Sequence, residues 1–296
     1  MTVIIEKFSD ISHNYKLLIC DLWGCLHNGQ FSFMEALKTL NRFRKEGGRV
    51  VLVTNAPRPK YLVEKQILKL GINKTHYDAL LTSGELTSEF IASKYINKIR
   101  VFHIGNSGYH SVFENTKNYN PSIKIELVTL EEADLIVCTE PFNPKEDTIG
   151  NYKDILSYGI KKSLPFICSN PDLVVDVGEA RELCAGSIAS FYEELGGKAT
   201  YLGKPYKEIY QKVYHFFNKS IKVKKSQTLC IGDGINTDIK GAELEKLDSL
   251  LVIGGLLKSK FLISKNNKPC IDIKTFNESI LMNEIIEPTY AIKFFE

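Results

Sequence analysis

The sequence predicts an α/β protein with a three-layer, Rossmann-like parallel-sheet core and a large inserted α/β cap domain. Two observations predict this class. Short apolar runs alternate with amphipathic helical patterns near both ends of the chain, and a further set of such units fills the middle. Alternation of strands and helices is typical of parallel sheets, because the crossover helices cover both faces.

The core is expected in two groups of strands and helices. Lys16–Asp21 is an apolar run that predicts a buried strand, and apolar residues then recur at three-residue intervals over 34–43 before Gly47-Gly48, which predicts a helix ending at glycine. The first group continues with a strand at 49–55, a helix at 60–71 and a strand–helix pair at 79–95. The second group comprises strands at 200–205, 228–233 and 249–255 with helices at 206–217 and 239–247.

Residues 99–198 lie between these groups and carry their own apolar runs, at 100–105, 123–130, 133–140 and 164–172. An insert of this length, in a chain whose two ends both look like one sheet, indicates a second domain. We therefore expect a discontinuous core domain of residues 1–98 and 199–296, with a cap domain of residues 99–198.

Composition narrows the class of protein. The 296 residues are 44% hydrophobic and 25% charged, as is ordinary for a globular protein, and the net charge of +3 comes from scattered basic residues, which argues against nucleic acid as a partner. The chain shows no signal-peptide pattern and no run of about 18 apolar residues, so we expect a cytoplasmic protein with no membrane partner. The seven cysteines lack CxxC spacing, which favours buried thiols over disulfides or a zinc site.

Polar residues follow four of the expected strands, at the carboxyl ends where parallel sheets bind ligands. These residues are Asp21, Thr54-Asn55, Gly203–Pro205 and Gly232–Asp238. If the strands are adjacent, Asp21 and Asp233 converge with a hydroxyl and a lysine. Two carboxylates so close repel each other unless a cation lies between them, and oxygen-only ligands of this kind suit Mg²⁺. The lysine and the hydroxyl would then hold a phosphate.

The order of these pieces resembles the haloacid dehalogenase superfamily of aspartate-nucleophile hydrolases. More narrowly, it resembles subfamily IIA, which includes pyridoxal, phosphoglycolate and nitrophenyl phosphatases with a large cap between the second and third motifs. The resemblance implies Mg²⁺-dependent hydrolysis of a small phosphorylated metabolite through an aspartyl-phosphate. Its motifs assign Asp21 as the nucleophile, with Thr54 and Lys204 as further catalytic residues. The implied metal ligands are Asp21, the backbone carbonyl of Trp23, Asp233 and Asp238.

Trp23 departs from the family pattern D-x-D-G-x-L, because the chain reads Asp-Leu-Trp-Gly-Cys-Leu over residues 21–26. The second aspartate of that pattern protonates the leaving oxygen and then activates water against the aspartyl-phosphate. An indole N–H can do neither. Loss of general acid–base catalysis costs about 10² to 10⁴ in rate, and least where the leaving group needs no proton.

Three functions are compatible with this substitution. The first is a Mg²⁺ phosphohydrolase specialised for good leaving groups, which the intact nucleophile and charge-balancing residues favour. The second is a non-catalytic protein of the same fold that binds a phosphorylated ligand. The third is a metal-independent dehalogenase, a class in which an aromatic residue also stands at this position, although Asp233, Asp238 and Lys204 argue against it.

Six residues, one of them Thr54 again, are candidates for substrate contact or proton transfer. His27, on the loop after the first strand, could be an auxiliary acid or base, or an ordinary loop residue. Arg58 stands where some pyridoxal phosphatases have an arginine near the substrate, but a surface ion pair would use it equally well. Asn170 and Asp172 resemble the cap loop that sets substrate choice in the subfamily, although a plain Asn-Pro turn uses the same residues. Thr54 and Asn55 complete the expected substrate contacts, and a homodimer through the cap is left open.

Overall fold

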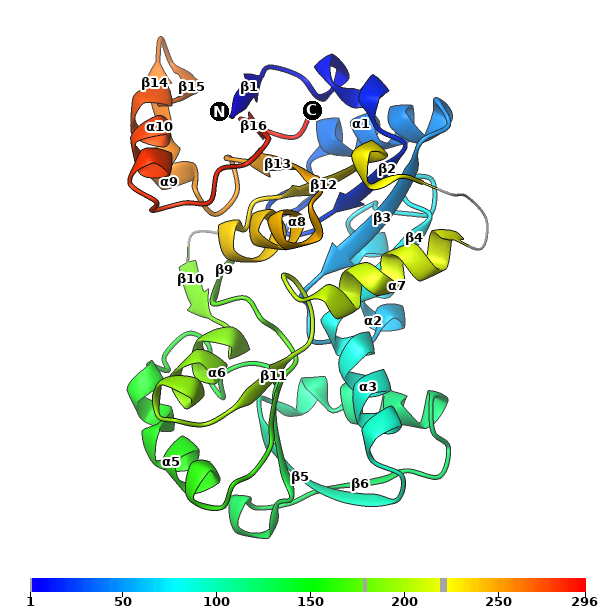
Figure 1. Ribbon diagram of the computed structural model, residues 1–296, viewed down its shortest axis with the longest axis vertical. Helices are drawn as coiled ribbons and strands as arrows, with labels where there is room; N and C mark the ends of the chain where they lie inside the picture. Colours follow the sequence, from blue (N-terminus) through cyan, green and yellow to red (C-terminus); the bar gives the residue numbers. More distant parts are fainter. Residues whose placement is uncertain (1, 178–179, 219–222) are drawn as a thin grey trace. The chain divides into compact units, whose positions relative to one another are not determined.

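The computed structural model describes residues 2–177, 180–218 and 223–296 (Figure 1). The chain divides into two compact units. Unit 1 comprises the described residues of Met1–Thr54, Glu64–Leu81 and Tyr210–Glu296, and unit 2 comprises those of Asn55–Val63 and Thr82–Ile209. Both units are built on parallel sheets, so the predicted α/β class with a core and a second α/β domain is confirmed.

Unit 1 contains a seven-stranded sheet within the described residues, in the order β1-β16-β13-β12-β2-β3-β4 (Figure 1). Its strands are β1 (Val3–Ile5), β2 (Leu17–Cys20), β3 (Arg49–Thr54), β4 (Ala79–Thr82), β12 (Thr228–Gly232), β13 (Asp248–Val252) and β16 (Tyr290–Ile292). The pairs β1–β16, β16–β13, β13–β12, β12–β2 and β2–β3 are parallel. The two ends of the chain therefore meet at one edge of this sheet.

The central strands β2 and β12 are buried along their whole length, as strands covered on both faces must be. Their register pairs Cys20 with Ile231. An aspartate directly follows each strand, Asp21 after β2 and Asp233 after β12. This pairing brings the two acidic residues to the same edge of the sheet.

The α-helices of the described residues before 82 and after 206 are α1 (Met34–Lys45), α2 (Lys60–Lys69), α7 (Lys207–Asn218), α8 (Lys240–Glu245), α9 (Lys258–Phe261) and α10 (Ile273–Leu281). The three-residue spacing in α1 buries Leu37, Leu40 and Phe43, while Met34, in the first turn, is exposed. A hairpin of β14 (Leu262–Lys265) and β15 (Lys268–Ile271) turns through Asn266 and Asn267, both at positive φ. The sequence analysis did not predict this hairpin or α10.

Unit 2 contains a five-stranded parallel sheet in its described part, in the order β11-β8-β7-β5-β6. The strands are β5 (Lys98–Ile104), β6 (Lys124–Leu127), β7 (Leu135–Cys138), β8 (Phe166–Cys168) and β11 (Ala199–Tyr201). The helices are α3 (Ser83–Lys94), α4 (Ser111–Asn115), α5 (Lys153–Lys161) and α6 (Ala185–Glu194), and β9 (Val174–Val177) pairs with β10 (Ala180–Leu183).

The assignment of the strand near 200–205 to the core sheet was wrong. This strand is β11, and its register pairs Tyr201 with Cys168 of β8, in the sheet of unit 2. A three-residue apolar strand fits the edge of either sheet, so its sequence does not indicate which one it joins. The domain boundaries at 98/99 and 198/199 stay a prediction, and the sheet of unit 2 runs from Lys98 to Tyr201.

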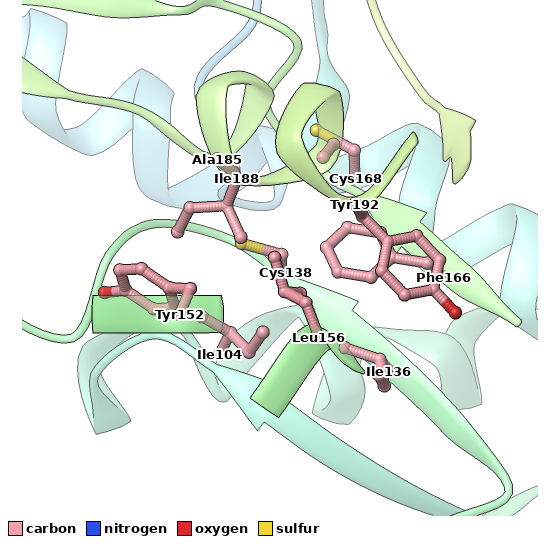
Figure 2. Close-up of a cluster of buried hydrophobic side chains, with 11 residues drawn as sticks. Ile104, Ile136, Cys138, Tyr152, Leu156, Phe166, Cys168, Ala185, Ile188 and Tyr192 are labelled. Atoms are coloured by element: carbon pink, nitrogen blue, oxygen red, sulfur yellow. The ribbon is translucent and has the colours of Figure 1, made fainter. Parts of the chain in front are cut away.

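The core of unit 2 is a cluster of buried side chains from β5, β7, β8, α5 and α6 (Figure 2). Phe166 and Tyr192 stack with ring centroids 4.8 Å apart, and the Tyr192 hydroxyl donates to the carbonyl oxygen of Leu164 (2.9 Å). Gly159 lets α5 approach the sheet, because a Cβ there would lie 2.7 Å from Cδ1 of Ile136. Tight aromatic and aliphatic packing thus holds helices on this sheet.

Two further expectations concern cysteines and membranes. All seven cysteines lie in the described parts of the chain and are free, six of them buried, as predicted. Among the described helices, none is both long enough and apolar enough to cross a membrane.

Replacing Leu156 with alanine should lower the free energy of unfolding of unit 2 by about 2 to 5 kcal/mol, because the fully buried side chain leaves a cavity. Leu127→Ala is the matched control, since Leu127 is 42% exposed, and it should change stability by about 0.5 kcal/mol or less. Urea unfolding curves would measure both. Equal losses for the two variants would contradict the packing described.

Candidate active site

Asp21 is held at the end of β2 by backbone contacts. Its N–H donates to the carbonyl oxygen of Ile231 (2.8 Å), which ties it to β12, and the Cys20 thiol donates to its carbonyl oxygen (3.2 Å). The residue is 8% exposed. Thr54 ends β3 on the other side of β2 and is also buried. Asp233, Asp21 and Thr54 therefore lie at the carboxyl ends of three adjacent strands, as the sequence predicts.

The loop after Asp21 folds back on itself. The N–H of Gly24 donates to the carbonyl oxygen of His27 (2.8 Å), and the N–H of Leu26 donates to the carbonyl oxygen of Leu22 (2.8 Å). Gly24 has φ +75°, and a Cβ on it would lie 1.9 Å from Oδ2 of Asp233. Only glycine allows this loop to pack directly against the carboxylate of Asp233.

The side chain of Trp23 packs within this loop. Its ring lies edge-on to that of His27, with centroids 5.0 Å apart. A Cβ on Gly29 would lie 2.5 Å from the Trp23 ring, so this second glycine, at φ +87°, makes room for the indole. The residue that replaces the family's second aspartate is thus part of a packed loop.

His27 is 2% exposed, and its Nδ1 accepts a hydrogen bond from the N–H of Gly29 (3.0 Å). Burial lowers the pKa of His27 to about 4. Near neutral pH the imidazole is therefore uncharged, and its Nδ1 lone pair is engaged. These contacts give a structural reason for His27 in the loop, and they do not favour it as a proton donor at neutral pH.

Asp233 and Asp238 are buried between glycine-rich segments. Oδ2 of Asp233 accepts from the N–H of Leu256 (2.9 Å), and Oδ2 of Asp238 accepts from that of Gly234 (3.2 Å). A Cβ on Gly232 would lie 2.0 Å from Cγ of Asp238, and one on Gly255 would lie 2.0 Å from Oδ2 of Asp233. The glycines of this motif let the backbone approach both carboxylates.

Asp21, Cys25 and Asp233 form a cluster in which one ligand atom from each residue lies within 4.8 Å of the other two. All three side chains are buried. Burial, together with the nearby carboxylate of Asp233, raises the pKa of the Cys25 thiol well above its usual value. The two carboxylates fit Mg²⁺, which takes one or two protein carboxylates and completes its shell with other oxygens.

Lys204 and Asn55 are joined within unit 2. Oδ1 of Asn55 accepts from the N–H of Lys204 (2.8 Å), and Nδ2 of Asn55 donates to the carbonyl oxygen of Lys204 (3.1 Å) and to Oδ1 of Asp172 (2.9 Å). Gly203 permits this approach at φ +138°, because a Cβ there would lie 2.5 Å from Oδ1 of Asn55. Asn55 thus aligns the backbone of Lys204. The position of Asn55 after a strand did not indicate this role.

Asn170 and Asp172 form the Asx turn that the Asn-Pro sequence suggested, with Oδ1 of Asn170 accepting from the N–H of Asp172 (3.1 Å). The hydrogen bond from Asn55 shows that Asp172 also reaches the segment that follows β3. The loop thus contains the Asx turn and also contacts Asn55. Its role in substrate choice stays a prediction.

Arg58 lies with its guanidinium carbon 4.8 Å from the centre of the Tyr109 ring. Burial raises the pKa of Glu140, and the neighbouring Tyr109 hydroxyl and Arg58 guanidinium oppose that shift. Neither alternative for Arg58, substrate contact or surface ion pair, included this aromatic partner. The three residues are far apart in sequence, so no spacing could have indicated their contact.

The predicted site residues divide between the two units. Unit 1 carries Asp21, Trp23, His27, Thr54, Asp233 and Asp238, and unit 2 carries Asn55, Arg58, Asn170, Asp172 and Lys204. The prediction that Lys204 follows a strand of the same sheet as Asp21 was wrong, because β11 belongs to the sheet of unit 2.

Two family models match the chain, one described as haloacid dehalogenase-like hydrolase over residues 18–117 and one as HAD-hydrolase-like over residues 201–277. A solved structure of a hydrolase of the haloacid dehalogenase-like family from Brucella suis 1330 is 32% identical, with a TM-score of 0.82, and the match covers 99% of this chain and 100% of that one. The chain belongs to the haloacid dehalogenase-like hydrolase family. The family expected from the motifs is therefore confirmed.

Relatives named by their activity are phosphatases. The chain is 24% identical to the 5′-nucleotidase YutF of Bacillus subtilis over 90% of this chain and 98% of that protein. It is 23% identical to phosphoglycolate phosphatase 1A of Arabidopsis thaliana over 89% of this chain and 75% of that protein. A possible sugar phosphatase from Cytophaga hutchinsonii shares the fold, with a TM-score of 0.75 at 22% identity over 99% of this chain and 98% of that one. The chain is a hydrolase of the phosphatase type.

Replacing Gly24 with alanine should weaken Mg²⁺ binding at least about tenfold, because the new Cβ would meet the carboxylate of Asp233. Gly47→Ala is the matched control: it also has positive φ, but a Cβ there meets nothing within 4 Å. The control should lose only about 1 to 2 kcal/mol of stability and bind Mg²⁺ normally. Titration calorimetry would measure binding. Normal Mg²⁺ binding by Gly24→Ala would show that Mg²⁺ binding does not depend on the close contact between this loop and Asp233.

Proposed function

We propose that the protein is a Mg²⁺-dependent phosphohydrolase that moves the phosphoryl group of a small phosphorylated metabolite to Asp21 and then to water. The observation that carries the proposal is the buried approach of Asp21 and Asp233 at the ends of adjacent strands. Membership of the hydrolase family supports the same chemistry. The 5′-nucleotidase and phosphoglycolate phosphatase relatives favour a small phosphorylated metabolite as substrate.

The metal site in this proposal consists of Asp21, Asp233, the backbone carbonyl of Trp23 and Asp238. Mg²⁺ there would neutralise negative charge on the phosphoryl oxygens and on the two carboxylates. Asp238 accepts a backbone N–H, and this hydrogen bond orients its carboxylate. An orienting hydrogen bond of this kind tunes how well a carboxylate serves a metal.

The nucleophile in this proposal is the carboxylate of Asp21. One of its oxygens forms a bond to phosphorus while the bond from phosphorus to the leaving oxygen breaks, and water later cleaves the aspartyl-phosphate. Thr54, buried at the end of β3, would donate its hydroxyl hydrogen to a phosphoryl oxygen. We retain Lys204 as the lysine that the family motif assigns to the phosphate, with its backbone aligned by Asn55.

Trp23 sets the substrate class in this proposal. The indole cannot protonate a leaving oxygen, and His27 is uncharged near neutral pH with its Nδ1 engaged. Leaving groups that depart as stable anions, such as carboxylates and nitrophenolates, are therefore favoured over alkoxides. Water's attack on the aspartyl-phosphate lacks the same group, so we expect a fast first turnover followed by slower release.

Asp21→Asn should lower turnover of nitrophenyl phosphate by at least about 10³-fold, because the amide is a poor nucleophile and a poor metal ligand. Asp154→Asn, in α5 of unit 2, is the control and should keep normal turnover. Excess chelator should also stop the unsubstituted protein. Full activity of Asp21→Asn would place the chemistry elsewhere, and chelator-resistant turnover of a halocarboxylate would favour the dehalogenase alternative.

Turnover of a series of phosphate compounds should fall steeply as the leaving group becomes more basic, with alkyl phosphates slower by about 3 kcal/mol of barrier or more. Trp23→Asp should flatten this dependence by adding an acid, whereas Trp23→Phe, which keeps the bulk but adds no acid, should not. Steady-state rates of the three proteins on one substrate series would measure the slopes.

Equal rates on alkyl and nitrophenyl phosphates by the unsubstituted protein would contradict the role given to Trp23. A different outcome would favour the non-catalytic alternative: binding of inorganic phosphate with no hydrolysis of acyl or nitrophenyl phosphates.

A further inference from the structure

Cys25 is the third member of the cluster that contains Asp21 and Asp233. Its sulfur and one carboxylate oxygen from each aspartate lie within 4.8 Å of one another, and Cys25 is 1% exposed. The cysteine is not one of the catalytic residues proposed above, which use only oxygen and nitrogen atoms. A sulfur beside two carboxylates nonetheless changes which cations this position can hold.

The separation of the three atoms suits a tetrahedral metal ion. With metal–oxygen bonds of about 2.0 to 2.2 Å and a metal–sulfur bond of about 2.3 Å, the ligand atoms of zinc lie about 3.3 to 3.7 Å apart. The atoms here lie within 4.8 Å, so each needs to move inward by about 1 Å or less. Small side-chain rotations give movements of this size without a change of fold.

We propose that Cys25 makes the site between Asp21 and Asp233 a mixed oxygen–sulfur site that binds thiophilic divalent cations such as Zn²⁺. The inference rests on the cation site of the proposed function. When such a cation binds, a metal–sulfur bond forms, the S–H bond of Cys25 breaks and the proton passes to water. Two carboxylates and one thiolate then supply three protein ligands, and water takes the fourth position, a common arrangement for zinc.

Mg²⁺ would not use Cys25. Hard cations bind oxygen, whereas thiolate ligands select soft or borderline ions. The same three residues would thus give Mg²⁺ two side-chain ligands and Zn²⁺ three. Zn²⁺ held in this way would compete with Mg²⁺ for the carboxylates of Asp21 and Asp233, because both ions use these two residues.

The experiment uses Cd²⁺ as the probe, because a thiolate bound to Cd²⁺ adds a charge-transfer absorption band in the ultraviolet that oxygen ligands do not give. Titration of the full-length protein with Cd²⁺ should produce the band and saturate at one ion per chain. Cys25→Ser should abolish the band and weaken Cd²⁺ binding by more than the roughly 10- to 100-fold that loss of an outer-shell partner costs. Binding of Mg²⁺ to the same variant should change far less.

Cys270→Ser is the matched control, because Cys270 is the one cysteine of the seven that is not fully buried and would bind added metal adventitiously. The control should keep the band at full intensity. Cys25→Ala provides a second variant without the thiol. Circular dichroism would check that each variant folds, and a folding defect in one variant leaves the other to give the result. Asp233→Asn should weaken Cd²⁺ and Mg²⁺ binding alike, because both ions use its carboxylate.

A Cd²⁺ titration with no thiolate band, or a band that persists in Cys25→Ser, would overturn the inference. These outcomes are separate from those of the proposed function. Mg²⁺-dependent hydrolysis without the band would contradict only the role of Cys25, and the band without any hydrolysis would contradict only the phosphohydrolase proposal.

Discussion

The close approach of two buried carboxylates, Asp21 and Asp233, is the constraint on which the rest of unit 1 depends. Two unit charges separated by 4 to 5 Å repel by about 3 to 4 kcal/mol at an effective dielectric constant near 20. The parallel pairing of β2 with β12 imposes the approach, and Gly24 and Gly255 bring backbone against Asp233 in place of solvent. A cation between the carboxylates would offset the repulsion that the fold creates.

In the loop after Asp21, the indole of Trp23 stands where the family pattern has an acid, and it is packed within the loop. An aspartate at this position would add a third carboxylate near the first two, whereas the indole packs edge-on against the His27 ring and lies against Gly29. Each of these residues has a structural partner inside the loop, so the loop is well packed without a proton donor. This packing gives a structural reason for an indole at position 23.

Much of this arrangement was predictable from the sequence, for physical reasons. The short apolar run before Asp21 predicts a buried strand, as observed. The glycines around Asp233 and Asp238 indicate backbone that passes close to other atoms. The sequence analysis assigned β11 to the wrong sheet, because three half-buried residues suit the edge of either sheet. Sequence spacing also could not reveal the contacts of Arg58 with Tyr109 or of Cys25 with Asp233, which join residues distant in the chain.

The central claim, that Asp21 is the nucleophile and shares a cation with Asp233, is tested most directly by a crystal structure with Mg²⁺ and fluoroberyllate, which mimics a phosphoryl group on a carboxylate. The account predicts beryllium bonded to an oxygen of Asp21, with Mg²⁺ between Asp21 and Asp233. Fluoroberyllate bound to another residue, or Mg²⁺ bound away from both carboxylates, would contradict it.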